Sequence, residues 1–284
     1  MGFIKRYHEA PKQIFKQVQQ VTYGDYALVH MFDKDPEYYE MFKEAVKSGR
    51  DVILDNSLFE LREAFDEDKY AKYIEELRPT WYIVPDCWKD SAGTIKRFFD
   101  FVNKYPNLPG KRIGVAQGMD LRETAACYRS LEPLCDKMAF NLHGEDWYCK
   151  STGSSRAAMV NTRDYLTQMS RGRFNIVYSM WNLGFINSDK PHHLLGTGLA
   201  EEAKWYREAG MNFIDSIDTS SPVACGMRYH KYLEHYGNTI KPSLLMCDHM
   251  DDVISDEQLS MVMHNIQVFD SFCNEESSYG SHNE

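Results

Sequence analysis

Residues 53–60 read ILDNSLFE, and the order of residue types in this stretch is unusual. Two aliphatic residues run directly into an aspartate, an asparagine and a serine, and an apolar pair and a glutamate follow. A strand inside a parallel sheet is expected to be apolar, and polar residues should begin where the strand ends. We therefore interpret residues 51–55 as a buried strand that carries Asp55 to its carboxyl end.

Other short apolar runs, each bounded by turn residues, have the same character. Besides 51–55, they cover residues 26–32, 80–86, 112–118, 137–144, 192–198 and 212–218. Helix-like segments lie between them at 66–77, 91–105, 120–131 and 199–210, and the last ends on Gly210, a residue suited to a helix C-cap. Because strands and helices alternate, the connection rules predict a parallel sheet with the helices outside it.

The fold class that we expect is α/β, as a TIM-type (β/α)8 barrel formed by a single domain over residues 1–284. Seven strands are visible, and the eighth is expected near residues 239–246 or as an irregular strand. A doubly wound open sheet is the alternative. No GxGxxG follows any strand, which disfavours the dinucleotide-binding version of that fold.

Two segments depart from the simple alternation. Residues 145–190 form an insertion after the fifth visible strand, with a helix expected near 156–169 and an aromatic segment at 174–185. From Ser255 the sequence predicts a capped amphipathic helix, and we expect the polar residues 274–284 to form a disordered tail.

The composition indicates a globular protein, because 43% hydrophobic residues in a chain of 284 can build a substantial core. A formal net charge of -10 argues against broad attraction to polyphosphate but leaves room for a local basic face. The seven cysteines form no CxxC pair, which suits reduced thiols. With no leader sequence and no apolar run of membrane-spanning length, we expect a soluble cytoplasmic protein without a membrane partner.

Polar side chains stand at the carboxyl ends of the predicted strands, where the active sites of parallel α/β barrels form. They are Asp55, Asp86, Gln117, Asn141 with His143, and Asp215 or Asp218. Aspartate is also common in turns and at helix N-caps, so the set has a purely structural explanation as well.

A cluster of carboxylates with an amide, without a His/Cys ligand set or a glycine-rich phosphate loop, favours glycosyl chemistry. One carboxylate would attack an anomeric carbon, and another would donate and accept the proton. The same cluster would suit a magnesium ion. Phe59, close behind Asp55, favours the glycosyl interpretation because a base can stack on its ring, although the residue taken alone is better explained as a core aromatic.

Six motifs occur in an order and with a spacing that resemble those of the tRNA-guanine transglycosylase (queuine tRNA-ribosyltransferase) family, which exchanges guanine for a 7-deazaguanine base. They are DNSLFE, VPDCW, GVAQG, FNLHG, LLGTG and GMNFIDS, and the resemblance extends from about residue 51 to residue 216. It is strongest between residues 196 and 215, where LLGTG is followed by a helix, Gly210 and then Asp215. The resemblance implies a pentosyltransferase.

The resemblance also implies roles for individual residues. Asp215 falls at the nucleophile that attacks C1′ of the nucleoside, and Asp55 at the general acid/base. Asp86 would accept hydrogen bonds from N1 and the exocyclic amine of the base. Gln117 would hold the base carbonyl, and Phe59 would stack on the ring. The remaining expected contacts with the base are Gly118, Asn141, Leu142 and Leu195.

Several positions depart from the family pattern. Asn141 and Leu142 stand where the family has a pair of glycines, so the pocket should be narrower or shaped for a different 7-substituent. Leu195 stands at a methionine and Glu60 at a glutamine. The CxCxxC zinc motif is missing, and Cys247 with His249 supplies only two candidate ligands, so we expect no metal site.

Without the zinc motif, the chain most resembles the DNA-guanine transglycosylases of phages and bacterial 7-deazaguanine DNA-modification systems. The implied partners are DNA, or alternatively tRNA, and a 7-deazaguanine base such as 7-cyano-7-deazaguanine; no cofactor is required. For a phage protein the expected location is the host cytoplasm. A base-releasing hydrolase and a non-catalytic nucleic-acid-binding subunit remain as alternatives.

Two aspartates compete for the role of nucleophile. Asp215 and Asp218 lie on opposite sides of an ideal strand, so only one should face the barrel mouth. Spacing favours Asp215, and closeness to the strand end favours Asp218; we place Asp215 first. Candidate phosphate contacts are Lys5, Arg6, Lys12, Lys16, Arg171, Arg173, Arg228 and Lys231, and each of them taken alone is better explained as a solvated surface charge.

Overall fold

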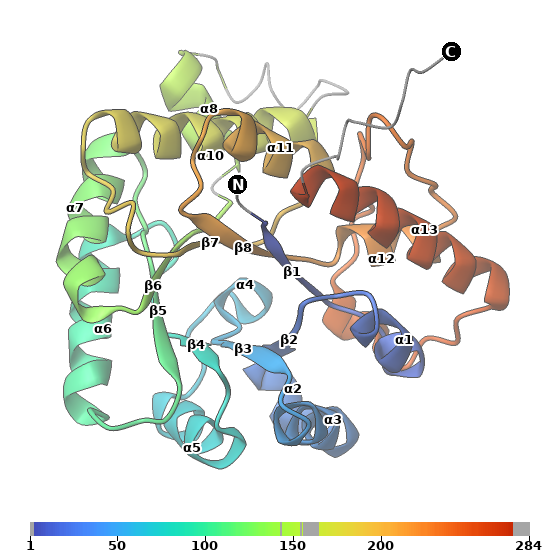
Figure 1. Ribbon diagram of the computed structural model, residues 1–284. Helices are drawn as coiled ribbons and strands as arrows, with labels where there is room; N and C mark the ends of the chain where they lie inside the picture. The colour runs from blue at the N-terminus through green and yellow to red at the C-terminus, as the bar shows by residue number, and fades with distance from the viewer. Residues whose placement is uncertain (1–2, 143, 154, 156–164, 275–284) are drawn as a thin grey trace.

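Eight parallel strands close into a barrel in the computed structural model, which describes residues 3–142, 144–153, 155 and 165–274 (Figure 1). Each strand pairs with the next, and the last pairs with the first. The strands are β1 (Lys5–His8), β2 (Gly24–Leu28), β3 (Asp51–Asp55), β4 (Trp81–Ile83), β5 (Lys111–Val115), β6 (Lys137–Phe140), β7 (His192–Leu194) and β8 (Ile214–Thr219). The predicted TIM-type barrel is confirmed.

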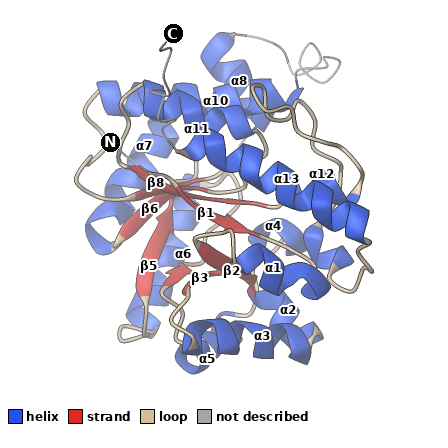
Figure 2. Ribbon diagram, turned by 45° about the vertical axis from the view of Figure 1, so that its right-hand side comes forward, coloured by secondary structure: helices blue, strands red, loops and turns tan. Residues whose placement is uncertain are grey.

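Most of the helices lie outside the strands, which Figure 2 draws in red, whereas α4 lies across the ring of strands in Figure 1. They are α1 (Phe15–Gln19), α2 (Val29–Lys34), α3 (Pro36–Lys47), α4 (Leu58–Leu61), α5 (Glu67–Leu77), α6 (Ser91–Lys104), α7 (Leu121–Leu131), α8 (Gly144–Thr152), α10 (Tyr165–Asn182), α11 (Ala200–Glu208), α12 (Ser221–Met227) and α13 (Asp256–Cys273). Short 3-10 helices are η1 (Lys12–Ile14), η2 (Glu132–Leu134) and η3 (Met246–His249). Among the described residues, no helix has the length and apolar character needed to cross a membrane.

Capping aspartates explain why the helices that follow β3, β4 and β5 begin where the sequence predicts. Asp66, Asp90 and Asp120 each accept a hydrogen bond from the backbone N–H three residues later. This bond satisfies a donor that the first helical turn leaves unpaired. At the C-terminal helix, Ser255 and Gln258 form a reciprocal capping box, as its sequence predicts.

The eighth strand is β1, at the amino end of the chain, so the prediction that it lies near residues 239–246 is wrong. Residues 239–245 are irregular. β1 escapes a search for apolar runs because its outward residues are polar, although they are buried. Arg6 pairs with Asp270 of α13 at 2.8 and 2.9 Å, and the inward Tyr7 is fully buried.

Two further boundaries differ from the sequence prediction. The apolar run at 26–32 is a strand only to Leu28, where α2 begins. The helix predicted near 156–169 falls mostly outside the described residues, and the aromatic segment 174–185 is mainly the second half of α10. The expected tail lies beyond the described residues, apart from Asn274.

A buried ion pair attaches α10 to the carboxyl ends of β6 and β7. The Arg173 guanidinium binds both carboxylate oxygens of Glu202 at 2.7 and 2.9 Å, and both side chains are fully buried. The same guanidinium donates to the carbonyls of Phe140 and Leu195. Arg173 therefore fixes the loop that follows β7, which contributes to the site described below.

Replacement of Arg173 by methionine should lower the free energy of unfolding by about 3–5 kcal/mol, because Glu202 would remain as a buried and unpaired carboxylate. Arg171→Met is the matched control, since Arg171 is exposed in the same helix and stacks on Trp205 at 5.2 Å from the ring centroid. That change should cost less than about 1 kcal/mol. Urea unfolding of the two variants measures both values, and equal losses would contradict the role assigned to Arg173.

Candidate active site at the carboxyl ends of the strands

Asp55 is held at the mouth of the barrel by two donors. Its Oδ2 accepts a hydrogen bond from the Tyr26 hydroxyl at 2.6 Å, and its Oδ1 accepts one from the backbone N–H of Ser57 at 2.5 Å. Ser57 adopts a left-handed backbone conformation (φ 60°), which turns the chain sharply from β3 into α4. The polar break in ILDNSLFE is therefore a tight turn that fixes the Asp55 carboxyl group.

Asp218 lies near the carboxyl end of β8 and is held from β7 and its following loop. Its Oδ1 is 3.0 Å from His193 Nε2, and the backbone N–H of Gly196 lies 3.0 and 3.2 Å from Oδ1 and Oδ2. The His193 ring stacks against the Tyr26 ring, with centroids 6.5 Å apart and planes 8° from parallel. The two stacked rings thus hold one carboxyl group each, Asp218 through His193 and Asp55 through Tyr26.

Asp215 does not face the mouth, and the prediction that placed it there is wrong. Its carboxylate pairs with Lys137 at 2.8 Å and with Lys5 at 3.6 Å, and these lysines begin β6 and β1. In the pairing of β8 with β7, His192 lies opposite Ile214 and His193 lies opposite Ser216, so Asp215 is an extra residue in β8. The strict alternation of side chains between the two faces of a strand therefore does not hold at Asp215. At about 3.3 Å per residue, Asp218 lies roughly 10 Å further along the strand, towards the mouth.

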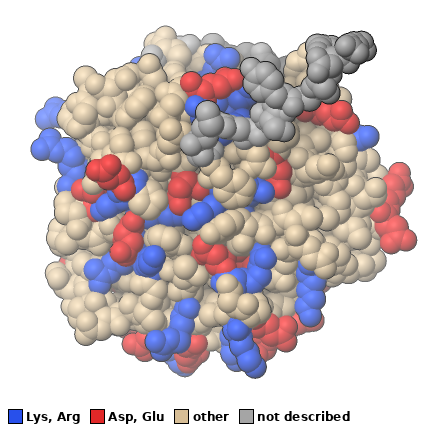
Figure 3. Space-filling model, in the orientation of Figure 1, with Lys and Arg blue, Asp and Glu red and all other residues tan. Residues whose placement is uncertain are grey.

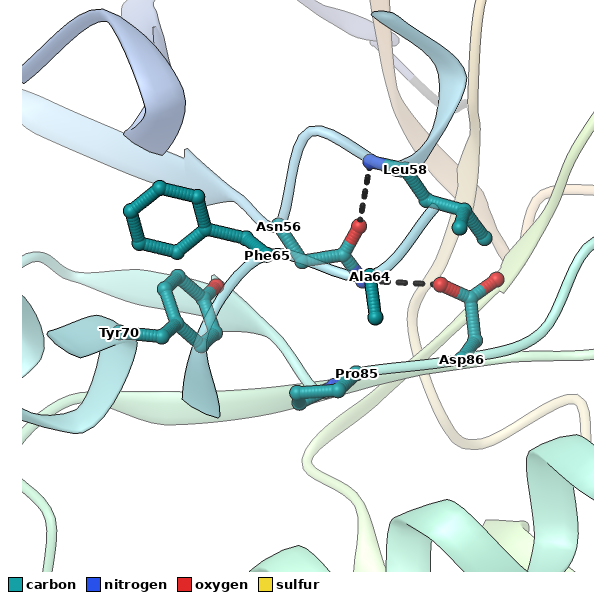
Figure 4. Close-up of a pocket in the computed structure, with 7 residues that line it drawn as sticks. All are labelled: Asn56, Leu58, Ala64, Phe65, Tyr70, Pro85 and Asp86. Carbon is teal, nitrogen blue, oxygen red and sulfur yellow. Dashed lines mark hydrogen bonds between the residues drawn. The ribbon is translucent and has the colours of Figure 1, made fainter. Parts of the chain in front are cut away.

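Asp86 lies just past β4, in a network with the amides of Asn56 and Gln117, of which Figure 4 shows Asn56. Its Oδ1 accepts from Asn56 Nδ2 at 2.8 Å, and its Oδ2 accepts from Gln117 Nε2 at 2.6 Å. Asn56 Oδ1 in turn accepts from the backbone N–H of Leu58 at 3.1 Å. Burial raises the pKa of Asp86, whereas the two amide donors act in the opposite direction.

A small cavity of about 10 Å³ lies beside this network. Its lining residues, labelled in Figure 4, are Asn56, Leu58, Ala64, Phe65, Tyr70, Pro85 and Asp86. A much larger hollow of about 580 Å³ lies elsewhere, along α7 and Phe185. The buried polar groups described above surround the mouth and do not line this larger hollow.

Phe59 lies at the rim of the mouth and is 44% exposed. Its ring centroid is 5.6 Å from that of Trp88, and the Arg62 guanidinium lies 4.3 Å from the Phe59 centroid. Phe59 lies in α4, which follows β3, and Trp88 lies in the loop that follows β4, so the aromatic rim borders Asp55 and Asp86. Stacking of Phe59 on a bound base stays a prediction.

The other predicted contacts differ in how far their surroundings fit a ligand. Asn141 is buried, and its Oδ1 has no hydrogen-bond partner among the described residues, which leaves an acceptor for a ligand. Leu142 and Leu195 are partly buried just past the ends of β6 and β7. Gly118 serves packing: a Cβ there would lie 2.4 Å from the backbone nitrogen of Thr124 in α7. His143 lies outside the described residues.

Three carboxyl groups at the mouth have raised pKa values, because burial disfavours the charged form. Burial raises the pKa of Asp55 to about 7, with a contribution from the charge of Asp218. The same causes act on Glu9, just past β1, and raise its pKa to about 7. For Glu60, burial and then the charge of Asp55 raise the pKa to about 9. The mouth is therefore suited to hold and release protons near neutral pH.

Sequence reasoning missed four residues of this site: Glu9, Tyr26, Asn56 and His193. Tyr26 and His193 lie in strands that the sequence did predict, on the inward-facing alternation that includes Asp55 and Asp218. The alternation of inward and outward residues along these strands could therefore have indicated that Tyr26 and His193 point into the barrel. Glu9 had no such signal, because it follows the strand that was not recognised.

The predicted basic residues do not form one patch. Arg6 and Arg173 are buried in ion pairs, Lys5 pairs with Asp215, and Lys12 contacts three carboxylates. Figure 3 shows acidic and basic side chains interspersed over the face in view.

Among the described residues no group of three His, Cys, Asp or Glu side chains is arranged to hold a metal ion, and His249 is paired with Asp252 at 2.8 Å.

The raised pKa of Asp55 predicts a specific pH dependence of stability. The unfolded chain loses this proton near pH 3.9 and the folded protein near pH 7, so the free energy of unfolding falls as the pH rises between these values. Asp55→Asn lacks this loss. As the pH rises from 5 to 8, the free energy of unfolding of Asp55→Asn should increase relative to that of the unsubstituted protein by at least about 1.4 kcal/mol, as measured by urea unfolding.

Asp33→Asn is the control, because hydrogen bonds from Lys69 and Tyr73 lower the pKa of Asp33. The stability contributed by Asp33 is present above its unfolded pKa and is lost only as the pH falls below that value. The stability difference between Asp33→Asn and the unsubstituted protein should therefore stay constant from pH 5 to pH 8. A constant difference for Asp55→Asn as well would contradict the raised pKa of Asp55.

No protein-family model and no curated protein matches this chain. What the mouth can do chemically follows from its own side chains. It presents one carboxyl group with a pKa near neutrality, a second held by a histidine and a backbone amide, and buried amide groups beside them.

Proposed function

We propose that this protein is a base-exchange transglycosylase that replaces guanine in a nucleic acid with a 7-deazaguanine base through a covalent aspartyl-sugar intermediate. Asp218 is the nucleophile and Asp55 is the general acid/base. DNA is the proposed polymer, on the basis of the resemblance and the missing zinc motif, and tRNA is the alternative. The proposal keeps the chemistry expected from the sequence and moves the nucleophile from Asp215 to Asp218.

One observation carries the proposal: two carboxyl groups meet at the mouth in different environments. Asp218 accepts hydrogen bonds from His193 and from the backbone N–H of Gly196, which hold its carboxyl group in place. Asp55 has a pKa of about 7, raised by burial, so it can both donate and accept a proton at neutral pH. Retaining glycosyl transfer uses one carboxylate as nucleophile and a second carboxyl group as proton carrier, and the two environments suit this division of roles.

In the first step, an oxygen of Asp218 attacks C1′ of the target nucleoside and the bond from C1′ to N9 of guanine breaks. The electron pair of that bond goes to the guanine, which takes the proton from Asp55. The products are an ester between the sugar and Asp218, free guanine and the Asp55 carboxylate. Oδ2 is the less engaged oxygen of Asp218, since its contact with Gly196 is the longer of the two.

In the second step, the 7-deazaguanine loses its N9 proton to Asp55 and attacks C1′ from the face that guanine left. The ester bond breaks, and its electron pair returns to the Asp218 carboxylate. Two inversions at C1′ give retention of configuration. Asp55 regains its proton, so the cycle needs no external acid, oxidant or cofactor.

Recognition of the base is assigned to the buried polar groups beside Asp55. Asp86 and Gln117 are positioned by their mutual hydrogen bond, and Asn141 Oδ1 lacks a partner among the described residues. Glu60 is protonated at neutral pH, since its pKa is about 9. It therefore offers one donor and one acceptor, as does the glutamine at that position of the family motif.

The target nucleoside has to leave its base stack to reach the mouth, because C1′ and the base edge are inaccessible within an intact duplex. Phe59, Trp88 and Arg62 at the rim offer aromatic faces and a cation to an extruded base or its neighbour. Their exposure at the border of Asp55 and Asp86 supports a nucleic-acid substrate over a free nucleoside.

Exchange of labelled guanine should be measured side by side on double-stranded DNA, single-stranded DNA and tRNA. We expect label to enter a DNA substrate. Incorporation into tRNA alone would move the assignment to the alternative polymer. Release of free base without exchange would indicate a hydrolase, and binding without either reaction would indicate a non-catalytic subunit. No exchange on any of the three substrates would contradict the proposed function.

Two variants of the same strand test the nucleophile. Asp218→Asn should lower exchange by at least about 10³-fold and abolish the covalent complex with nucleic acid, because an amide cannot form the ester. Asp215→Asn, at the other end of β8, should still form that complex. The opposite pattern, with trapping lost only in Asp215→Asn, would restore Asp215 as the nucleophile.

A further inference from the structure

A continuous line of hydrogen bonds crosses the interior of the barrel and ends on Asp218. Lys137 Nζ lies 2.8 Å from Ser216 Oγ, Ser216 Oγ lies 2.9 Å from His193 Nδ1, and His193 Nε2 lies 3.0 Å from Asp218 Oδ1. Lys137, Ser216 and His193 are fully buried. The line starts at the amino end of β6 and reaches the mouth, so it joins the two ends of the barrel.

We propose that Lys137 and Ser216 fix His193 as the tautomer that carries its proton on Nε2, and that His193 thereby orients the Asp218 carboxylate for attack. His193, Ser216 and Lys137 are positioning residues in this proposal, which rests on the proposed function of Asp218. Ser216 ends the motif GMNFIDS, but the resemblance assigns no role to Ser216, His193 or Lys137.

The direction of the hydrogen bonds follows from counting protons. An ammonium group can only donate, so Ser216 Oγ accepts from Lys137. The single hydroxyl proton of Ser216 can go to His193 Nδ1 or to Asp215 Oδ1, which lies 2.8 Å away. The Asp218 carboxylate, as the proposed nucleophile, can only accept, so a neutral His193 ring carries its proton on Nε2 and its Nδ1 accepts the Ser216 hydroxyl proton, while Lys137 and Lys5 pair with Asp215. His193 then donates from Nε2 to Asp218.

The charges around His193 favour the same arrangement. A cation stands beyond its Nδ1 side at Lys137, and a carboxylate faces its Nε2 side at Asp218. Burial lowers the pKa of His193, and Lys137 lowers it further, whereas Asp218 raises it. A neutral ring with its proton on Nε2 fits these opposing charges. The titratable groups that face the ring are Tyr7, Tyr26, Lys137, Asp215 and Asp218.

Asp215 gains a function in this arrangement. Its carboxylate neutralises Lys137, whose ammonium group is fully buried and also lies 4.4 Å from the centroid of the Trp81 ring. Without Asp215 the buried cation would lack a counter-charge, which is costly in a barrel interior. The aspartate that the sequence motif indicated thus supports the nucleophile from the opposite end of the barrel.

The test combines NMR of the histidine rings with kinetics. In the ¹⁵N-labelled protein at pH 7, His193 should show a protonated Nε2 and an unprotonated Nδ1, assigned by comparison with His193→Gln. In Lys137→Met the Ser216 hydroxyl should turn to Asp215, and His193 should then carry protons on both nitrogens. We expect kcat for base exchange to fall roughly ten- to a hundredfold while KM stays within about threefold, because none of these residues touches the base.

Ser216 provides the second variant pair, which remains informative if Lys137→Met does not fold. Ser216→Ala should shift the Nδ1 resonance of His193 and lower kcat, and Ser216→Thr, which keeps the hydroxyl, should restore both. A proton on Nδ1 in the unsubstituted protein would overturn the proposal. So would ring resonances and kcat that are unchanged in both Lys137→Met and Ser216→Ala.

The two proposals fail in distinguishable ways, because the NMR measurement needs no substrate. If the unsubstituted protein shows the expected tautomer but exchanges no base, the proposed function fails. If it exchanges base but carries the His193 proton on Nδ1, the role assigned to Lys137 and Ser216 fails.

Discussion

A packed barrel interior excludes water, and the rest of the structure depends on this constraint. Ionisable side chains that point inward have to find their partners on other strands of the barrel. Lys137 meets Asp215, Tyr7 meets Asp51, His193 meets Asp218, and Tyr26 meets Asp55. These contacts cross between strands, so closing the barrel and placing the carboxyl groups are one process. The positions of the carboxyl groups at the mouth are therefore linked to side chains that lie deeper in the barrel.

The same burial that positions the mouth also makes it costly to fold. Asp55, Glu9 and Glu60 all have pKa values raised by burial, which means that their ionised forms are disfavoured in the folded protein. A protein selected for stability alone would replace them with apolar or amide side chains. Groups that titrate near neutral pH at the ends of parallel strands are instead what acid/base chemistry requires. The loss of stability at the mouth and its proposed chemistry therefore have one physical cause.

Much of the fold was predictable because local signals agree with the tertiary structure. The α5, α6 and α7 helices begin at capping aspartates, and most strands are apolar runs with polar residues at their ends. Asp55, Asp86 and Gln117 were predictable from this strand-end rule. β1 was not, because its outward residues, Arg6 and His8, are polar side chains buried against α13, and no apolar run reveals such a strand.

The error at Asp215 has a different origin. Spacing along an ideal strand assumes strict alternation, and a single extra residue in β8 breaks it. Only pairing with β7 reveals that irregularity, so the local patterns, of which the closeness of Asp218 to the strand end is one, could not decide between the two aspartates. His193 and Tyr26 were within reach, since both continue the inward alternation of predicted strands. Their importance becomes visible only when the strands that carry them are placed side by side.

The central claim is that Asp218 forms the covalent bond to the sugar. It is tested most directly by trapping the protein on nucleic acid under exchange conditions, digesting the complex and locating the modified side chain by tandem mass spectrometry. The account predicts that the sugar is attached to Asp218, in the peptide that also contains Asp215. Attachment to Asp215 or to Asp55, or a reaction that proceeds with no trapped adduct at all, would contradict it.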